Sequence, residues 1–177
     1  MTVSIILGPD CELEAIALRS FLEYLGIVVV LRPIGRPLDL MAILDGDPQT
    51  GISEFLLFCF HGENGKFIMP VISDDLYEAN EPKGDVGPEH IERFSTLNGQ
   101  QVIATGCTVG NSQMAKSFLA AGAASYTAAG EYPEGNAVLV FVTSFFYHLM
   151  RGEKYSDAFE KARNIDNDTL LFRKFEP

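Results

Sequence analysis

The chain of 177 residues has little of what several protein classes require. It contains three cysteines, three histidines and no tryptophan. It has 13 lysines and arginines and 24 aspartates and glutamates, which gives a net charge of −11. Without a basic cluster, nucleic acids and anionic membranes are poor partners. Its apolar runs are shorter than the roughly 18 residues of a membrane helix. The cysteines show no metal-ligand spacing and are odd in number, which argues against a zinc site and a disulfide framework.

What is present fits one globular domain. Hydrophobic residues make up 47% of the chain and charged residues 21%, which is the balance of an ordinary folded domain. The length predicts a single domain over residues 1–177. Residues 1–5 lack the basic start of a signal peptide. We therefore expect a cytoplasmic protein whose thiols stay reduced.

Strand-like and helix-like segments alternate along the chain, a pattern that predicts an α/β fold with a mostly parallel sheet of about five strands. Short apolar runs predict strands at 3–7, 27–31, 55–60, 102–105 and 124–127. Helical periodicity predicts helices at 11–25, 38–44, 112–121, 136–150 and 156–163. The stretch 63–88 is the least regular, with a short strand expected at 66–72.

Two dipeptides stand where buried strands are expected to end. They are His61-Gly62 and Gly106-Cys107, and each directly follows an apolar run. In an open α/β sheet, ligands bind outside the carboxyl ends of the strands. A histidine and a thiol at that edge suit a general base and a nucleophile. They are 46 positions apart, close to the spacing of about 50 in the caspase signature.

Backbone groups beside these side chains complete the predicted chemistry. Gly62 has no Cβ, so the chain can turn sharply there, and its N–H with that of Cys107 would form an oxyanion hole. Gly106 would let a substrate approach closely. Strand alternation places Cys59 in the core. A rival reactive thiol is Cys11, whose pKa a helix N-terminus would lower.

The carboxyl-terminal part of the chain carries a family resemblance. It reads VIATGCTVG at 102–110, MAKSFLAAGAASY at 114–126, FFYHLMRG at 145–152 and DAFEKAR at 157–163. This order resembles the CHAT-type branch of the clan CD cysteine peptidases, the superfamily of caspase, separase and gingipain. The resemblance implies a three-layer αβα caspase-like (caspase–haemoglobinase) fold. It also implies that His61 is the general base, that Cys107 is the nucleophile and that Gly62 contributes an oxyanion N–H.

The same resemblance suggests where a substrate would be read. Family members that cleave after Arg or Lys use acidic residues near the loop after the first strand, so Asp10 and Asp75 are candidate substrate-binding residues, together with Gly106. The alternative for Asp10 is a helix N-cap. The sequence departs from the family at Gly106, where the family usually has Ala, and at Thr108, where it usually has an acidic residue.

These observations predict a cysteine endopeptidase that acts on a protein or peptide substrate. The first alternative is a catalytically inactive caspase-fold protein that serves as a binding or scaffold module. The second keeps the dyad but hydrolyses a non-peptide amide or ester. No cofactor is expected; a calcium requirement and a homodimer are open, although no calcium motif is present.

Overall fold

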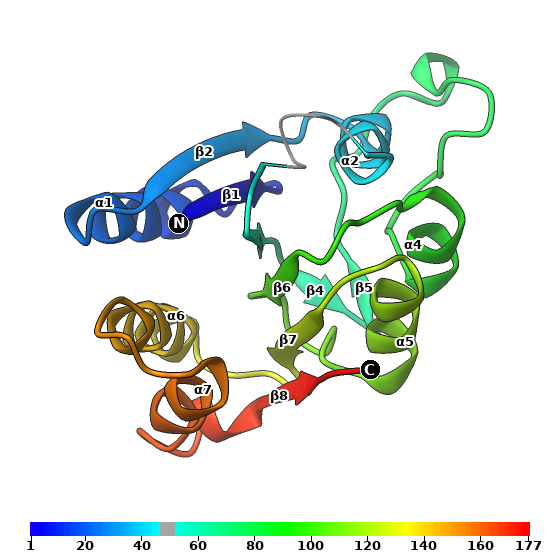
Figure 1. Ribbon diagram of the computed structural model, residues 1–177. Coiled ribbons are helices and arrows are strands. Elements are labelled where there is room, and N and C mark those ends of the chain that lie inside the picture. Colours follow the sequence, from blue (N-terminus) through cyan, green and yellow to red (C-terminus); the bar gives the residue numbers. More distant parts are fainter. Residues whose placement is uncertain (47–51) are drawn as a thin grey trace.

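The computed structural model describes residues 1–46 and 52–177 (Figure 1). Its centre is a six-stranded sheet in the order β2-β1-β3-β6-β7-β8. The strands are β1 (Thr2–Leu7), β2 (Val28–Pro33), β3 (Phe55–Cys59), β6 (Gln101–Ala104), β7 (Ser125–Ala129) and β8 (Phe172–Phe175). All neighbours pair in parallel except β7 and β8, which are antiparallel. The predicted α/β fold with a mostly parallel sheet is therefore confirmed.

Helices cover both faces of this sheet and make three layers (Figure 1). One face carries α1 (Glu12–Tyr24), α6 (Gly135–Met150) and α7 (Tyr155–Arg163). The other carries α2 (Pro37–Leu44), α4 (Pro88–Phe94) and α5 (Ser112–Ala120). The short elements are the hairpin of β4 (Gly62–Glu63) and β5 (Lys66–Phe67), and the 3-10 turns η1 (Asp74–Leu76) and η2 (Thr169–Leu171). None of the described helices combines the length and hydropathy needed to cross a bilayer.

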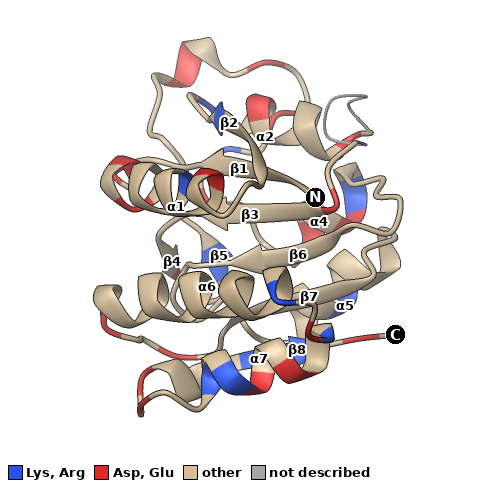
Figure 2. Cartoon of the chain, turned by 60° about the vertical axis from the view of Figure 1, so that its left-hand side comes forward, with Lys and Arg blue, Asp and Glu red and all other residues tan. Residues whose placement is uncertain are grey.

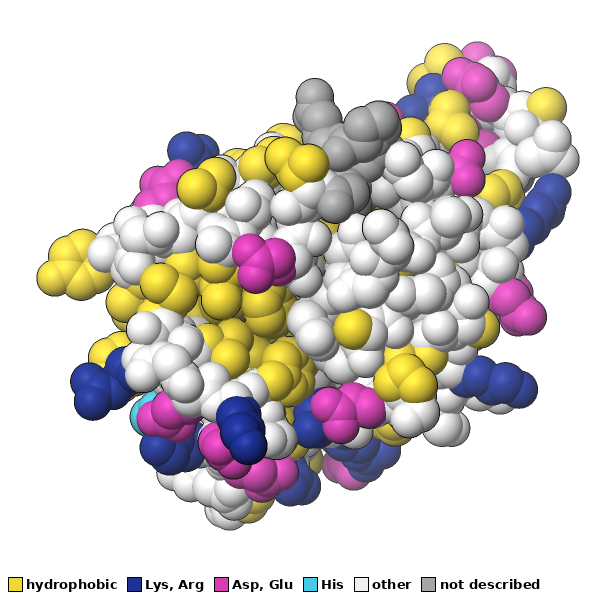
Figure 3. All heavy atoms as spheres, viewed as in Figure 1, with side chains coloured by type: hydrophobic (Ala, Val, Ile, Leu, Met, Phe, Trp, Pro, Cys, Tyr) yellow, Lys and Arg dark blue, Asp and Glu magenta, His cyan; other side chains and the backbone are white. Residues whose placement is uncertain are grey.

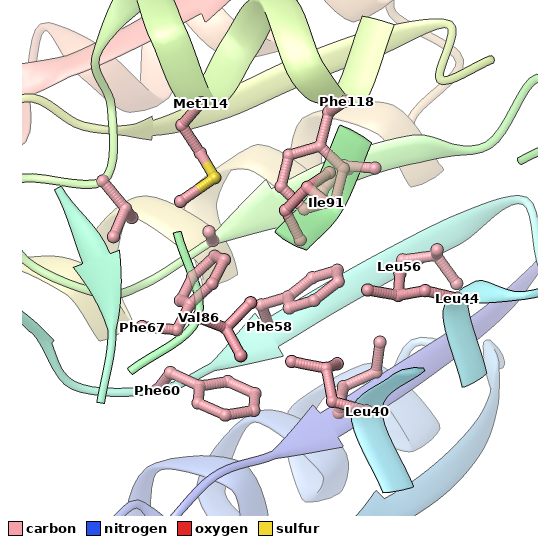
Figure 4. Close-up of a cluster of buried hydrophobic side chains, with 14 of the residues drawn as sticks. Leu40, Leu44, Leu56, Phe58, Phe60, Phe67, Val86, Ile91, Met114 and Phe118 are labelled. Atoms are coloured by element: carbon pink, nitrogen blue, oxygen red, sulfur yellow. The ribbon is translucent and has the colours of Figure 1, made fainter. Parts of the chain in front are cut away.

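Alternate side chains of β3 point to opposite faces of the sheet and belong to two separate hydrophobic cores. Phe58 packs toward α2, α4 and α5, where its ring lies 5.4 Å from that of Phe67 (Figure 4). Leu57 and Cys59 point to the opposite face, against α1 and α6. Cys59 is fully buried, as predicted for a core residue. Figure 3 shows hydrophobic side chains reaching the surface between α1 and α6.

The sheet has one strand more than the sequence predicted. The sixth strand, β8, contains Arg173 and Lys174, so it lacks the continuous apolar run by which the buried strands were found. It lies at the edge of the sheet, where charged side chains protect an unpaired strand. Its anchor is Phe172, which is fully buried and stacks on Phe141 with ring centroids 3.8 Å apart.

The predicted strand at 66–72 is also shorter in the structure, where only Lys66–Phe67 is extended. Phe67 exchanges two backbone hydrogen bonds with Val86, at 2.9 and 3.0 Å. This bridge takes the place of further pairing along the hairpin. It also connects the end of the irregular stretch, at Val86, to the hydrophobic core that contains Phe67.

A buried ion pair fixes the irregular stretch before α4. The Glu81 carboxylate has no exposed side-chain surface and accepts two hydrogen bonds from the Arg36 guanidinium. It also accepts the backbone N–H groups of Leu38 at 2.9 Å and Glu78 at 3.0 Å. The Arg36 hydrogen bonds are the main cause that lowers the pKa of Glu81 to about 2. The carboxylate thus joins this stretch to the start of α2.

Candidate active site

Sheet register brings the two dipeptides to the same level. Phe58 of β3 pairs with Ala104 of β6, and His61 and Cys107 each lie three residues beyond these partners. The strand order also reverses between β1 and β3, since the chain goes from β1 outward to β2 and then back to the other side of β1. Such a reversal opens a crevice at the carboxyl edge of a parallel sheet. His61 follows β3, which borders this crevice, and Cys107 follows the next strand of the sheet, β6.

The backbones of the two dipeptides are in direct contact. A Cβ on Gly62 would lie 2.2 Å from the Cys107 carbonyl oxygen, and a Cβ on Gly106 would lie 3.1 Å from the carbonyl oxygen of Phe60. The contact at Gly62 is too short for any side chain, whereas the contact at Gly106 is tight and would need a small shift of its neighbour. Glycine is therefore required at position 62 so that the loops can approach each other.

The loop that carries Cys107 holds a strained residue. Thr108 has φ +62°, a conformation that is a genuine outlier for a β-branched residue. Three hydrogen bonds hold it: its N–H donates to the Glu131 carbonyl at 2.9 Å, its hydroxyl accepts the Gly65 N–H at 3.0 Å, and its carbonyl accepts the Asn111 amide at 3.2 Å. Such strain is retained where the surrounding structure over-determines it, often at functional sites.

The Cys107 thiol lies among negative charges. It is partly exposed. Burial raises its pKa above the ordinary value, and the carboxylates of Glu63 and Glu14 raise it further. A thiol in this environment is protonated at neutral pH, so it needs a base to become a nucleophile. The exposed His61 side chain is the imidazole at the same edge.

Glu14 is the residue of this site that the sequence did not reveal. It lies in the first turn of α1, and its Oε1 is buried without a hydrogen-bond partner among the described residues. Burial raises the pKa of Glu14, while hydrogen bonds from Thr105 and Cys59 and the charge of His61 oppose that rise. The carboxylate therefore interacts electrostatically with the imidazole. The available signal was an acidic residue in the first turn of a helix that starts at the edge where His61 lies.

The structure corrects the prediction for Cys11. Its thiol is buried and accepts a hydrogen bond from the His61 backbone N–H. Burial, followed by the negative charge of Glu14, raises its pKa to about 12, although the helix N-terminus was expected to lower it. Cys11 is thus a packed residue beneath the base rather than a rival nucleophile.

Asp10 lies in the loop after β1, at the edge where His61 stands, and is exposed. Its φ is +60°, and the helix N-cap is Cys11. The N-cap alternative for Asp10 is therefore wrong, because Asp10 precedes the N-cap residue and has a left-handed backbone conformation. Asp75 lies in η1 and is bonded to Ser73, in the stretch that the Arg36–Glu81 pair holds against α2.

Charge is distributed unevenly around the site. In Figure 2 the ribbons of β3, β6 and β7 carry no charged positions, whereas α1 is marked by acidic ones. Within residues 1–46 and 52–177, no group of three or more His, Cys, Asp or Glu side chains is arranged to hold a metal ion. The groups described at the edge that carries His61 and Cys107 are a thiol, an imidazole, carboxylates and backbone N–H groups.

Comparisons with known proteins bear on the fold. No protein-family model and no curated protein sequence matches the chain. Among solved structures, the separase–securin complex of Saccharomyces cerevisiae superposes with a TM-score of 0.60 at 14% identity, over 98% of this chain. Gingipain R, an Arg-specific cysteine proteinase, superposes with a TM-score of 0.61 at 11% identity, over 99% of this chain.

A further match is the complex of the pro- and mature domains of RgpB from Porphyromonas gingivalis, with a TM-score of 0.58 and 11% identity over 99% of the chain. The chain spans 11% of the separase chain and 46% of the gingipain chain. These structures define the class of fold. The chain has the caspase-like fold of separase and gingipain, as the sequence resemblance implied.

Proposed function

We propose that this protein is a cysteine endopeptidase with Cys107 as nucleophile and His61 as general base. The observation that carries the proposal is the equal offset of the two residues beyond a paired register of β3 and β6, with their backbones in contact at Gly62. A nucleophile and base delivered to one edge are what acyl transfer by a thiol requires. The caspase-like fold supports the same chemistry.

The proposed reaction uses His61 first as a base and then as an acid in each half. His61 takes the Cys107 proton as the sulfur attacks the peptide carbonyl, and the N–H groups of Gly62 and Cys107 receive the negative oxygen. The imidazolium then gives its proton to the leaving amine, which leaves a thioester. Water, deprotonated by His61, attacks the thioester and releases the acid and the thiol.

Glu14 is proposed as the positioning residue for His61. A carboxylate that interacts with the imidazole stabilises the imidazolium formed when the thiol loses its proton. The raised pKa of Cys107 makes such a base necessary, because little thiolate exists before substrate arrives. Glu14 acts through His61 and does not touch the reacting atoms.

A second candidate is a catalytically inactive binding or scaffold module. The acidic surroundings that raise the pKa of Cys107 favour it, since they oppose the thiolate. The dyad would also be suited to the hydrolysis of a non-peptide amide or ester.

Asp10, which is exposed in the loop after β1, is the residue proposed to bind a basic substrate residue, with Asp75 and Gly106 as further substrate-binding candidates. A cytoplasmic location, a homodimer and a calcium requirement stay predictions.

The proposal is tested by incubating a complex peptide library with the purified protein, with and without calcium, beside Cys107→Ala. We expect cleavages made by the parent protein alone, whose flanking residues also report the substrate preference. Identical products from both proteins would contradict the peptidase and favour the scaffold. Simple amides and esters in parallel reactions separate the non-peptide alternative.

A further inference from the structure

Glu63 and Tyr132 meet beside the candidate nucleophile. Glu63 lies in the hairpin that follows the base, and Tyr132 lies in the loop after β7. The Tyr132 hydroxyl donates a hydrogen bond to Glu63 Oε1 at 2.8 Å. The same loop is fixed to the nucleophile segment by the N–H of Thr108, which donates to the Glu131 carbonyl at 2.9 Å. The pair therefore connects the two loops that flank Cys107.

The described contacts give Glu63 a neutral partner. Its cross-strand neighbour in the hairpin is Lys66, but that ammonium bonds Glu89 at 3.0 Å. Arg173, on the neighbouring strand β8, pairs with Glu131 at 3.8 Å. The cations of the flanking elements are thus engaged by other carboxylates, and the hydrogen bond that Glu63 accepts comes from a hydroxyl.

A shallow, open hollow of about 400 Å³ lies beside Tyr132. Its lining contains no lysine or arginine and is made by Asn64, Gly65, Thr108, Asn111, Ser112, Gln113 and Tyr132. Amide and hydroxyl oxygens accept hydrogen bonds from an ammonium or a guanidinium group. The hollow therefore suits the side chain of a lysine or arginine that approaches Glu63.

We infer that Glu63 is a specificity-determining residue that binds a cationic side chain of the substrate beside Cys107. The inference rests on the proposed function. A bound ammonium or guanidinium takes the place of the Tyr132 hydroxyl and offsets the negative charge next to the thiol. Recognition of the cation and ionisation of the nucleophile are linked in this way, so substrates that carry the cation react fastest.

The charged groups that face the thiol come from three elements. Burial is the largest cause of the raised pKa of Cys107, and the carboxylates of Glu63 in β4 and Glu14 in α1 follow. His61 stands at the end of β3. Glu14 is beneath His61 and is partly buried, whereas Glu63 is exposed and accessible to a substrate. Of the two carboxylates that act on the thiol, Glu63 is therefore the one that a substrate cation can reach.

The test compares two thiol reagents that differ in charge, 2-aminoethyl and 2-sulfonatoethyl methanethiosulfonate. The Cys107 thiolate attacks each with release of methanesulfinate, and peptide mapping by mass spectrometry follows the site. The ratio of the two rates cancels the ionisation of the thiol, and division by the same ratio for 2-mercaptoethanol cancels the different intrinsic reactivities of the two reagents. We expect Glu63→Gln to lower this ratio about fivefold, the effect of one nearby and partly screened charge.

Two further variants complete the experiment. Glu134→Gln removes an equivalent exposed charge from the loop before α6 and should leave the ratio unchanged, which controls for net charge. Tyr132→Phe keeps the Glu63 charge and should maintain or raise the ratio. An unchanged ratio in Glu63→Gln, or an equal fall in either of the other variants, would overturn the inference. A fall confined to Glu63→Gln in a protein that cuts no peptide would support the charge effect and contradict the peptidase.

Discussion

Two partly or fully buried glutamates lie in different regions of this molecule and have opposite electrostatic environments. Glu81, beside α2, is bound by the Arg36 guanidinium and by two backbone N–H groups, and its pKa falls to about 2. Glu14, at the catalytic edge, has a buried oxygen without a hydrogen-bond partner among the described residues, and its pKa is raised. The same side chain is thus stabilised as an anion in one region and disfavoured in the other.

The difference separates a structural carboxylate from one available for function. A fully paired carboxylate has no remaining capacity to respond to a neighbour, and it anchors the segment that carries it. A carboxylate that is buried without a cation of its own is destabilised as an anion, so it interacts strongly with any positive charge that forms nearby. At Glu14 that charge is the imidazolium of His61. Groups of this kind concentrate in active sites.

The largest expected effect is on catalysis. Glu14→Gln should lower kcat about 100-fold with little change in KM, because the imidazolium loses the carboxylate that stabilises it. Glu81→Gln is the matched control and should leave kcat unchanged. Steady-state rates measured across pH distinguish a positioning role, since the limb due to the histidine should shift in Glu14→Gln alone. Equal losses in both variants would remove the functional distinction between the two glutamates.

The next effect is on stability. Glu81→Gln should lower the free energy of unfolding by about 1–3 kcal/mol at neutral pH, because four hydrogen-bond donors lose their anionic acceptor. The folded-state pKa of Glu81, about 2, lies below the ordinary 4.5. Its contribution is therefore complete above pH 4.5 and is lost as pH falls toward 2. Urea unfolding of parent and variant should show a difference that narrows over this range; a constant difference would contradict the ion pair as its source.

The smallest effect has the opposite sign. Folding raises the pKa of Glu14 above the ordinary 4.5, so its favourable contribution is present below pH 4.5 and is lost as pH rises through the folded-state value. Above that folded-state value the ionised side chain destabilises the fold. Glu14→Gln should therefore raise the free energy of unfolding by about 1 kcal/mol, the usual gain when a functional but unfavourable group is replaced. A lower urea midpoint for this variant at neutral pH would show that the carboxylate is structural.

Much of the architecture could be predicted because each buried strand is a continuous apolar run that stops at a polar or glycine residue. The ends of β3 shortly before His61 and of β6 shortly before Gly106 follow from this pattern, and the register that brings His61 and Cys107 level follows from parallel pairing. The edge strand β8 could not be found in this way, since Arg173 and Lys174 interrupt any apolar pattern and pairing with β7 defines it.

The pKa shifts at the site could not be predicted from the sequence, because they too depend on how the elements pack. Glu14 and Cys11 belong to α1, and only the packing of that helix against β3 brings them beneath His61. The expectation for Cys11 considered the helix N-terminus alone, but burial and the negative charge of Glu14 outweigh it and raise the pKa. Local patterns thus predict where side chains lie along the chain, and the balance of burial and charge emerges only when the elements pack.

The central claim is that His61 and Cys107 act as one catalytic unit. Its most direct test is a double-mutant cycle on a peptide that the protein cleaves, with kcat/KM measured for the parent, His61→Ala, Cys107→Ala and the double variant. Residues that act as a unit give strongly non-additive losses. We predict that either single variant loses about as much activity as the double variant. Losses that add, or full activity in Cys107→Ala, would contradict the dyad.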